Sequence, residues 1–246
     1  MTRLLVCCIA IALLAPTVAA AGGLNLSWDD CGLSGRTSRT FACNTNDGVD
    51  VLVASFDPPP GITKLIGIDA VIEVITAAPT SLPQWWHVEG SGCRDGSLTV
   101  DTDFSALPSQ CLDYWSGGAS STVAFEAGPS NSARMIVSCR LPDGLAGEVI
   151  PGNEYSAFRL ILDHAHAVGT GACAGCSVAA CLLIDEIRLI QPPELGDYRL
   201  CNPRDRNFVV WQGALPIGCP PLHSPLYCAS TPTRTSTWGE IKTVYR

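Results

Sequence analysis

The clearest pattern in the chain is an alternation of hydrophobic and polar residues that runs from Leu65 to Thr76. Apolar side chains occupy almost every second position, and Asp69 and Glu73 fall between them. A period of two is typical of a β-strand with one face in the core and one face in water. This segment therefore predicts a long, half-buried strand.

Shorter segments of the same kind recur along the chain, separated by clusters of Gly, Ser, Pro and Asp. The further expected strands are Leu24–Trp28, Phe41–Thr45, Val49–Phe56, Trp85–Glu89, Ser97–Asp101, Thr122–Glu126, Arg134–Arg140, Tyr155–Asp163, Cys181–Ile190 and Phe208–Trp211. Asp47-Gly48 would supply the tight turn of a hairpin between the second and third of these. Because no segment keeps a helical period over several turns, we expect an all-β protein, an antiparallel and jelly-roll-like β-sandwich.

The two ends of the chain differ from this strand-rich part. Residues 1–21 contain one arginine, an apolar run and then small residues, which is the layout of a secretory signal peptide. We expect the sandwich at residues 22–191, an irregular Pro- and Cys-rich extension at 192–232, and a short helix in 233–246. No apolar run approaches the roughly 20 residues of a membrane-spanning helix, so we expect an exported protein, extracellular or periplasmic, without a membrane span.

Cysteine use supports export. The chain has 13 cysteines, of which Cys7 and Cys8 fall in the expected signal peptide. The remaining eleven predict a disulfide-stapled fold from an oxidising compartment, with at least one thiol left over. They are Cys31, Cys43, Cys93, Cys111, Cys139, Cys173, Cys176, Cys181, Cys201, Cys219 and Cys228.

Short disulfides that close turn-rich loops are expected between Cys31 and Cys43 and between Cys93 and Cys111. For the cysteine-rich loop we expect Cys173 or Cys176 to pair with Cys181, and another bond to reach Cys139 or the extension. The alternative for the Cys173–Cys176 pair, a zinc or redox site, lacks a fourth ligand and a following helix.

Charge and motifs exclude several functions. Acidic residues outnumber basic ones 23 to 15, so phosphate backbones are repelled and nucleic acid is not an expected partner. The sequence has no nucleophile elbow, phosphate loop or dinucleotide motif. We therefore expect no enzymatic activity, with one alternative described next.

The alternative is a metal-dependent hydrolase centred on His164 and His166. Residues two apart in a strand share a face, so both imidazoles could bind one zinc ion, with Asp163, Asp185 or Glu186 as a further ligand. The competing interpretation is a pair of polar residues at the end of a strand. A calcium site formed by the loop residues Asn44, Asn46, Asp47 and Asp50 is also considered, but the glycine falls one place early for the standard loop.

Aromatic residues suggest a ligand site of another kind. Trp85 and Trp86 are adjacent, so an extended chain would turn one ring outward, where it could stack on a sugar together with Tyr114 or Trp115. The alternative is ordinary packing beside prolines.

Three segments carry a resemblance to known proteins: CAGCSVAACLLIDEIRLIQP, NFVVWQGALPIGCP and the ending TPTRTSTWGEIKTVYR. They resemble a group of uncharacterised secreted bacterial proteins, which implies an exported β-rich protein but no activity. The strand ACLLIDEIRL is also similar to the last strand of jelly-roll modules in carbohydrate-binding and adhesion proteins.

Together these observations favour a secreted, non-enzymatic binding or envelope-associated module whose partner is a glycan or a cell-surface protein. A third hypothesis, separate from these, is that the ending TWGEIKTVYR serves as a recognition tag for sorting or envelope attachment.

Overall fold

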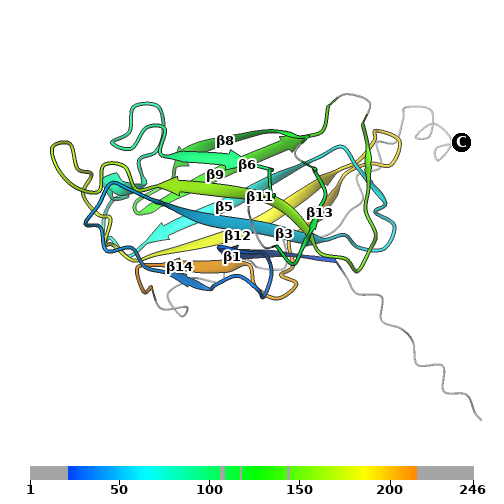
Figure 1. Ribbon diagram of the computed structural model, residues 1–246, viewed down its shortest axis with the longest axis horizontal. Helices are drawn as coiled ribbons and strands as arrows, with labels where there is room; N and C mark the ends of the chain where they lie inside the picture. Colours follow the sequence, from blue (N-terminus) through cyan, green and yellow to red (C-terminus); the bar gives the residue numbers. More distant parts are fainter. Residues whose placement is uncertain (1–21, 106–108, 117, 143–144, 215–246) are drawn as a thin grey trace, which may run out of the picture.

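Two β-sheets face each other across a hydrophobic core in the computed structural model, which describes residues 22–105, 109–116, 118–142 and 145–214 (Figure 1). The smaller sheet contains, in spatial order, β1 (Gly23–Trp28), β3 (Val49–Asp57), β11 (Tyr155–Asp163) and β6 (Leu98–Asp101), with β7 (Leu112–Asp113) also paired to β11. The larger sheet contains β2 (Ser38–Arg39), β14 (Phe208–Trp211), β12 (Ala180–Ile190), β5 (Gly67–Thr76), β9 (Ser132–Arg140) and β8 (Ser120–Ala127), with β13 (Tyr198–Leu200) also paired to β12. The two-residue strands β4 (Lys64–Leu65) and β10 (Gly147–Glu148) pair with each other.

The predicted all-β sandwich is confirmed. The alternating segment forms β5, which lies between β12 and β9 in the larger sheet. Ile68, Ala70, Ile72 and Val74 are fully buried, whereas Asp69, Val71 and Glu73 face outward. Among the described residues, no helix is long and apolar enough to cross a membrane.

Two expected strands are wrong. Residues 41–45 form no strand, and β3 pairs with β1 and β11 instead of forming a hairpin with them. The segment expected at Trp85–Glu89 is instead a single 3₁₀ turn, η1 (Gln84–Trp86). A helical turn lets the adjacent rings of Trp85 and Trp86 both enter the core, which the alternating faces of a strand forbid.

The described part of the expected C-terminal extension belongs to the sandwich. β14 lies between β2 and β12, and β13 extends the same edge of β12. We therefore see no boundary at residue 191. The expected signal peptide and the expected helix in 233–246 lie outside the described residues.

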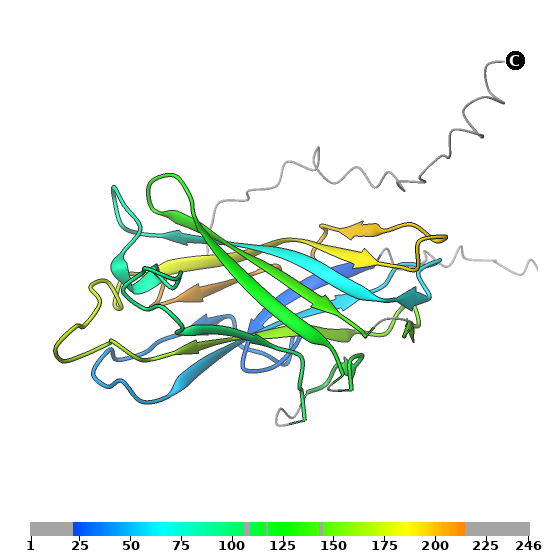
Figure 2. The same cartoon turned by 90° about the horizontal axis from the view of Figure 1, so that it is seen from above.

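Long loops gather at one end of the sandwich, on the left in Figures 1 and 2. At this end β5 and β11 finish, and β3, β9 and β12 begin. We call it the loop end, and it consists of residues 40–48, 77–97, 128–131 and 164–179.

Candidate functional site

Two disulfides tie three segments of the loop end together. Cys43 is bonded to Cys176, and Cys93 is bonded to Cys173, across sequence separations of 133 and 80 residues. A third disulfide, Cys31–Cys111, joins the loop after β1 to the start of β7. The loop end is therefore held covalently although its segments are far apart in the chain.

The expected short disulfides Cys31–Cys43 and Cys93–Cys111 are wrong, because strands lead the neighbouring cysteines to different parts of the sandwich. Pairing of Cys173 or Cys176 with Cys181 is wrong as well. Cys139 was expected in a disulfide but is a free thiol in the core. Burial raises the pKa of the Cys139 thiol to about 12, so it stays protonated and unreactive at neutral pH.

Arg94 fixes two loops through its buried guanidinium group. It donates hydrogen bonds to the backbone carbonyls of Trp85 (2.9 Å), Ala165 (3.2 Å) and Asp163, and it lies 3.4 Å from the centre of the Trp85 ring. Burial lowers the pKa of Arg94 to about 10, although the charge of Asp163 opposes this shift. The group therefore remains charged at neutral pH and binds both loops in one place.

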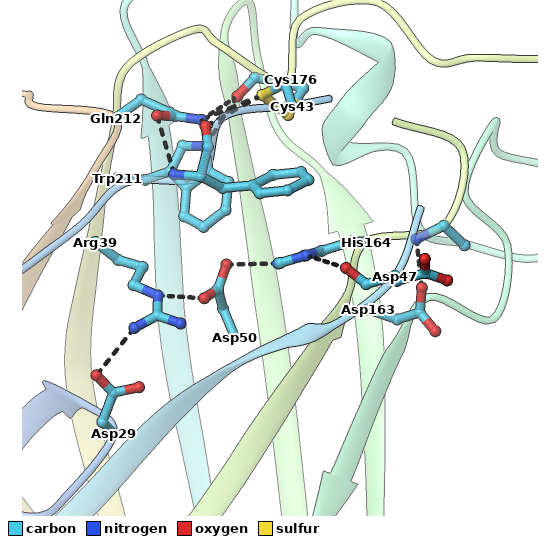
Figure 3. A network of polar contacts seen from close by, with 12 residues as sticks. Asp29, Arg39, Cys43, Asp47, Asp50, Asp163, His164, Cys176, Trp211 and Gln212 are labelled. Atoms are coloured by element: carbon cyan, nitrogen blue, oxygen red, sulfur yellow. Dashed lines mark hydrogen bonds and ion pairs between the residues drawn. A yellow bond between two sulfur atoms is a disulfide. The ribbon is translucent and has the colours of Figure 1, made fainter. Parts of the chain in front are cut away.

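A chain of polar contacts joins Asp29, Arg39, Asp50 and His164 (Figure 3). Arg39 donates to Asp29 at 3.2 Å and also to Asp50, whose side chain is only 1% exposed. The other oxygen of Asp50 is 2.8 Å from Nε2 of His164, and Nδ1 of His164 is 3.0 Å from the carbonyl of Asp47. Both contacts of His164 are satisfied together only when each ring nitrogen carries a hydrogen, because a carbonyl and a carboxylate accept but do not donate.

The position of His164 depends on its neighbours. Gly48 has a φ angle of +102°, and a Cβ atom added there would lie 3.1 Å from Nδ1 of His164, so glycine is required. Phe41 stacks on the imidazole with 3.7 Å between ring centres. The Gln212 amide holds this loop by donating to the carbonyls of Phe41 (2.6 Å) and Cys176 (3.2 Å). The imidazole is thus enclosed, and neither nitrogen is available to a substrate or a metal.

The shared face expected for His164 and His166 is wrong, because β11 ends at Asp163. His166 adopts a φ angle of +64° and is exposed, with Nδ1 3.3 Å from the carbonyl of Gly171, while His164 turns inward. Glu186 lies further along β12, 3.4 Å from Arg199. The described residues contain no group of three or more side chains that could hold a metal ion.

The calcium interpretation also does not fit. The amide of Asn46 donates to the Val168 carbonyl (3.2 Å) and accepts from the Val168 N–H (3.0 Å), so it joins two loops. Asp50 points into the core toward Arg39 and His164. These side chains therefore do not converge on one point.

The expected aromatic platform is wrong. Trp85 and Trp86 are fully buried, and Trp115 is buried with its Nε1 donating to the Ala157 carbonyl at 2.7 Å. The hydroxyl of Tyr114 donates to the Leu65 carbonyl and accepts from the Gly147 N–H. Burial raises the pKa of Tyr114 to about 12. All four rings thus pack the fold.

The surface of the loop end is acidic, a feature that the net charge of −8 could not locate. Its exposed or half-buried side chains include the carboxylates of Asp47, Glu89 and Asp95, with Asp163 adjoining it at the end of β11, and its one arginine, Arg94, is buried.

A depression of about 340 Å³ opens on this surface. Glu89 and Asp95 lie at it, and Leu98, Val123 and Phe125 provide apolar surface. Two carboxylates and several apolar side chains therefore meet at this depression.

No known protein family matches the chain, and neither does any curated protein. Fold and site define its class: a disulfide-linked β-sandwich protein with a rigid, acidic loop end.

Proposed function

We propose that the protein is a secreted, non-enzymatic binding module that holds an amino-bearing glycan at the acidic depression of the loop end. The observation that carries this proposal is the presence of Glu89 and Asp95 beside the apolar side chains of Leu98, Val123 and Phe125, on a surface whose one arginine is buried. Carboxylates gathered in a concave site attract cations, and apolar groups pack against the C–H faces of a sugar ring. Neutral and acidic glycans would gain less binding free energy at this site.

The rigidity of the loop end supports binding as the function. Two disulfides, the Arg94 hydrogen bonds and the Asp50–His164 pair fix the loops before a ligand arrives. A site that is already ordered loses less conformational entropy on binding. The disulfides also support an oxidising location such as the extracellular space or the periplasm.

The order of the strands supports the jelly-roll comparison. Successive strands β3, β5, β6 and β8 alternate between the two sheets, as do β9, β11 and β12. Such alternation is typical of jelly rolls, many of which bind carbohydrate. Fold alone does not establish function, so the proposal depends on the depression.

The alternative function, a metal-dependent hydrolase, was based on two histidines that share one face, and His164 and His166 do not have this arrangement. Both nitrogens of His164 are occupied, and His166 faces away from it. The carboxylates of Asp101 and Asp103 are engaged by Arg159 and by the Ser105 N–H. None of these groups is poised as a general base with a neighbouring nucleophile.

The test is a glycan array that compares amino-bearing, neutral and acidic polysaccharides at low and high salt. We expect binding to amino-bearing glycans that weakens with salt, and a loss of roughly tenfold, about 1.4 kcal/mol, in Glu89→Gln and in Asp95→Asn. The matched control is Glu148→Gln, an exposed carboxylate on β10, which pairs with β4 at the opposite end. The proposal fails if amino-bearing glycans do not bind, or if the control weakens binding as much as the other two variants.

A further inference from the structure

We infer that the C-terminal segment, residues 215–246, is strapped onto the outer face of the larger sheet. In this arrangement Cys219 and Cys228 form disulfides with Cys181 and Cys201, one with each. The segment itself lies outside the described residues, and the inference comes from the sheet that would receive it.

The cysteines of the described residues leave two bonds to assign. Three disulfides use six cysteines, and Cys139 is a free thiol. Cys181 and Cys201 are also disulfide-bonded. The remaining cysteines of the chain are Cys219 and Cys228, apart from two in the expected signal peptide.

Cys181 and Cys201 cannot be bonded to each other. Cys181 lies opposite Val210, whereas Leu200, the neighbour of Cys201, lies opposite Ile187 on the same side of β12. With a rise of about 3.3 Å per residue, five or six residues separate the two positions by roughly 16–20 Å. A disulfide needs Cα atoms within about 7 Å, so each cysteine has a different partner.

The burial of the outer face supports a covering layer. In β12, Leu182 and Ile184 point into the core, so Cys181 and Leu183 point outward, and Val210 of β14 faces outward beside Cys181. These outward side chains are only 3%, 4% and 3% exposed, yet they do not belong to the core cluster. This part of the outer face is therefore closed to solvent.

The C-terminal segment has the reach and composition to be that layer. The described chain ends at Ala214, shortly after β14, and Cys219 can lie up to about 17 Å beyond it. Prolines between Ala214 and Cys228 disfavour a further paired strand, because proline lacks an N–H donor. Apolar side chains that can pack on the sheet are interspersed: Ile217, Leu222, Leu226 and Tyr227.

This arrangement changes how the chain ends. Cys228 becomes a fixed point on the sheet, and only residues 229–246, with Trp238, Ile241 and Tyr245, extend beyond the last bond. A recognition tag in TWGEIKTVYR would then be presented from a defined position on the sandwich.

Disulfide mapping of the mature full-length protein tests the inference. Thiols are blocked with N-ethylmaleimide at acidic pH, and the unreduced protein is digested and analysed by mass spectrometry. We expect peptides containing Cys181 or Cys201 to be linked to peptides containing Cys219 or Cys228. A bond between Cys219 and Cys228, a link to a second copy of the chain, or blocked thiols at Cys219 and Cys228 would overturn it.

Limited digestion with proteinase K gives an independent readout. In the variant Cys219→Ser/Cys228→Ser, we expect cleavage between residues 215 and 228 to be at least about tenfold faster than in the wild type. The matched control is Cys139→Ala, which removes a cysteine that forms no disulfide. Equal cleavage rates in the wild type and the double variant would contradict a strap.

Discussion

Arg94 is fully buried, yet its guanidinium group meets three backbone carbonyls and an aromatic ring. The sequence gives no sign of this role, because an arginine between Cys93 and Asp95 looks like any polar loop residue. Asp50 and His164 show the same difficulty, since their contact joins positions 114 residues apart. Chemistry at these sites depends on which loops meet, and local sequence does not encode it.

Replacement of Arg94 tests its role. We expect Arg94→Met to lower the free energy of unfolding by about 3 kcal/mol, because three buried carbonyls lose a charged donor. Urea denaturation of the oxidised protein measures the change. The control is Arg134→Met, whose side chain is 58% exposed beside Glu73 and should cost less than about 1 kcal/mol. Equal losses of unfolding free energy in the two variants would show that the buried hydrogen bonds of Arg94 do not stabilise the fold.

The elements that could be predicted from the sequence are those in which the hydrophobic pattern continues over many residues. The alternation in β5 and the apolar run of β12 come from burial against the facing sheet, and Tyr155–Asp163 was predicted with the bounds that β11 has. Two-residue strands such as β2 and β10 are too short to show a period. Phe41 was wrongly predicted to lie in a strand. Its apolar ring stacks on His164 from a loop instead of packing on a sheet face.

The outer face of the larger sheet carries an ionic ladder across three strands. Asp69 of β5 accepts hydrogen bonds from Ser138 (2.7 Å) and Arg140 (2.6 Å) of β9 and from Arg188 of β12. Burial alone would raise the pKa of Asp69, but these hydrogen bonds outweigh it and the pKa is lowered. The carboxylate therefore stabilises the folded sheet only while it is ionised.

The pH dependence of unfolding tests this ladder. Because the folded pKa of Asp69 lies below the unfolded value of about 3.9, its contribution is present above about pH 4 and is lost as pH falls through the folded pKa. We expect Asp69→Asn to flatten the acid limb of stability below about pH 4. The effect should stay below about 1 kcal/mol, since the pair is partly exposed to solvent. An acid limb in Asp69→Asn that matches the one in Glu148→Gln would contradict the expectation.

For the whole molecule, the class of fold was predictable but the cross-links were not. The number of cysteines indicated disulfides. Which cysteines pair depends on where the strands place each loop in the folded protein, and the sequence does not show this. Both predicted short pairs failed for this reason, and the tryptophans at η1 moved from an expected surface platform into the core. Charge placement was equally hidden, because the carboxylates of the loop end come from two segments that are far apart in the sequence.

Removing one long-range disulfide tests how the loop end is held. We expect Cys43→Ser/Cys176→Ser to lower the free energy of unfolding by about 3 kcal/mol, since the bond closes a long loop in the unfolded chain. Guanidinium denaturation measures this, and Cys139→Ala serves as the control without a lost cross-link. If the two variants unfold at the same denaturant concentration, the disulfide does not stabilise the fold.

The non-consecutive pairing of cysteines has a consequence for biogenesis. A chain that meets oxidant from its N-terminus onward presents Cys31 and Cys43 to each other long before Cys111 and Cys176 emerge. An oxidase acting on this order would first join the wrong thiols. Because such bonds are rearranged only by thiol–disulfide exchange, correct pairing requires a disulfide isomerase, or oxidation delayed until the whole chain is available.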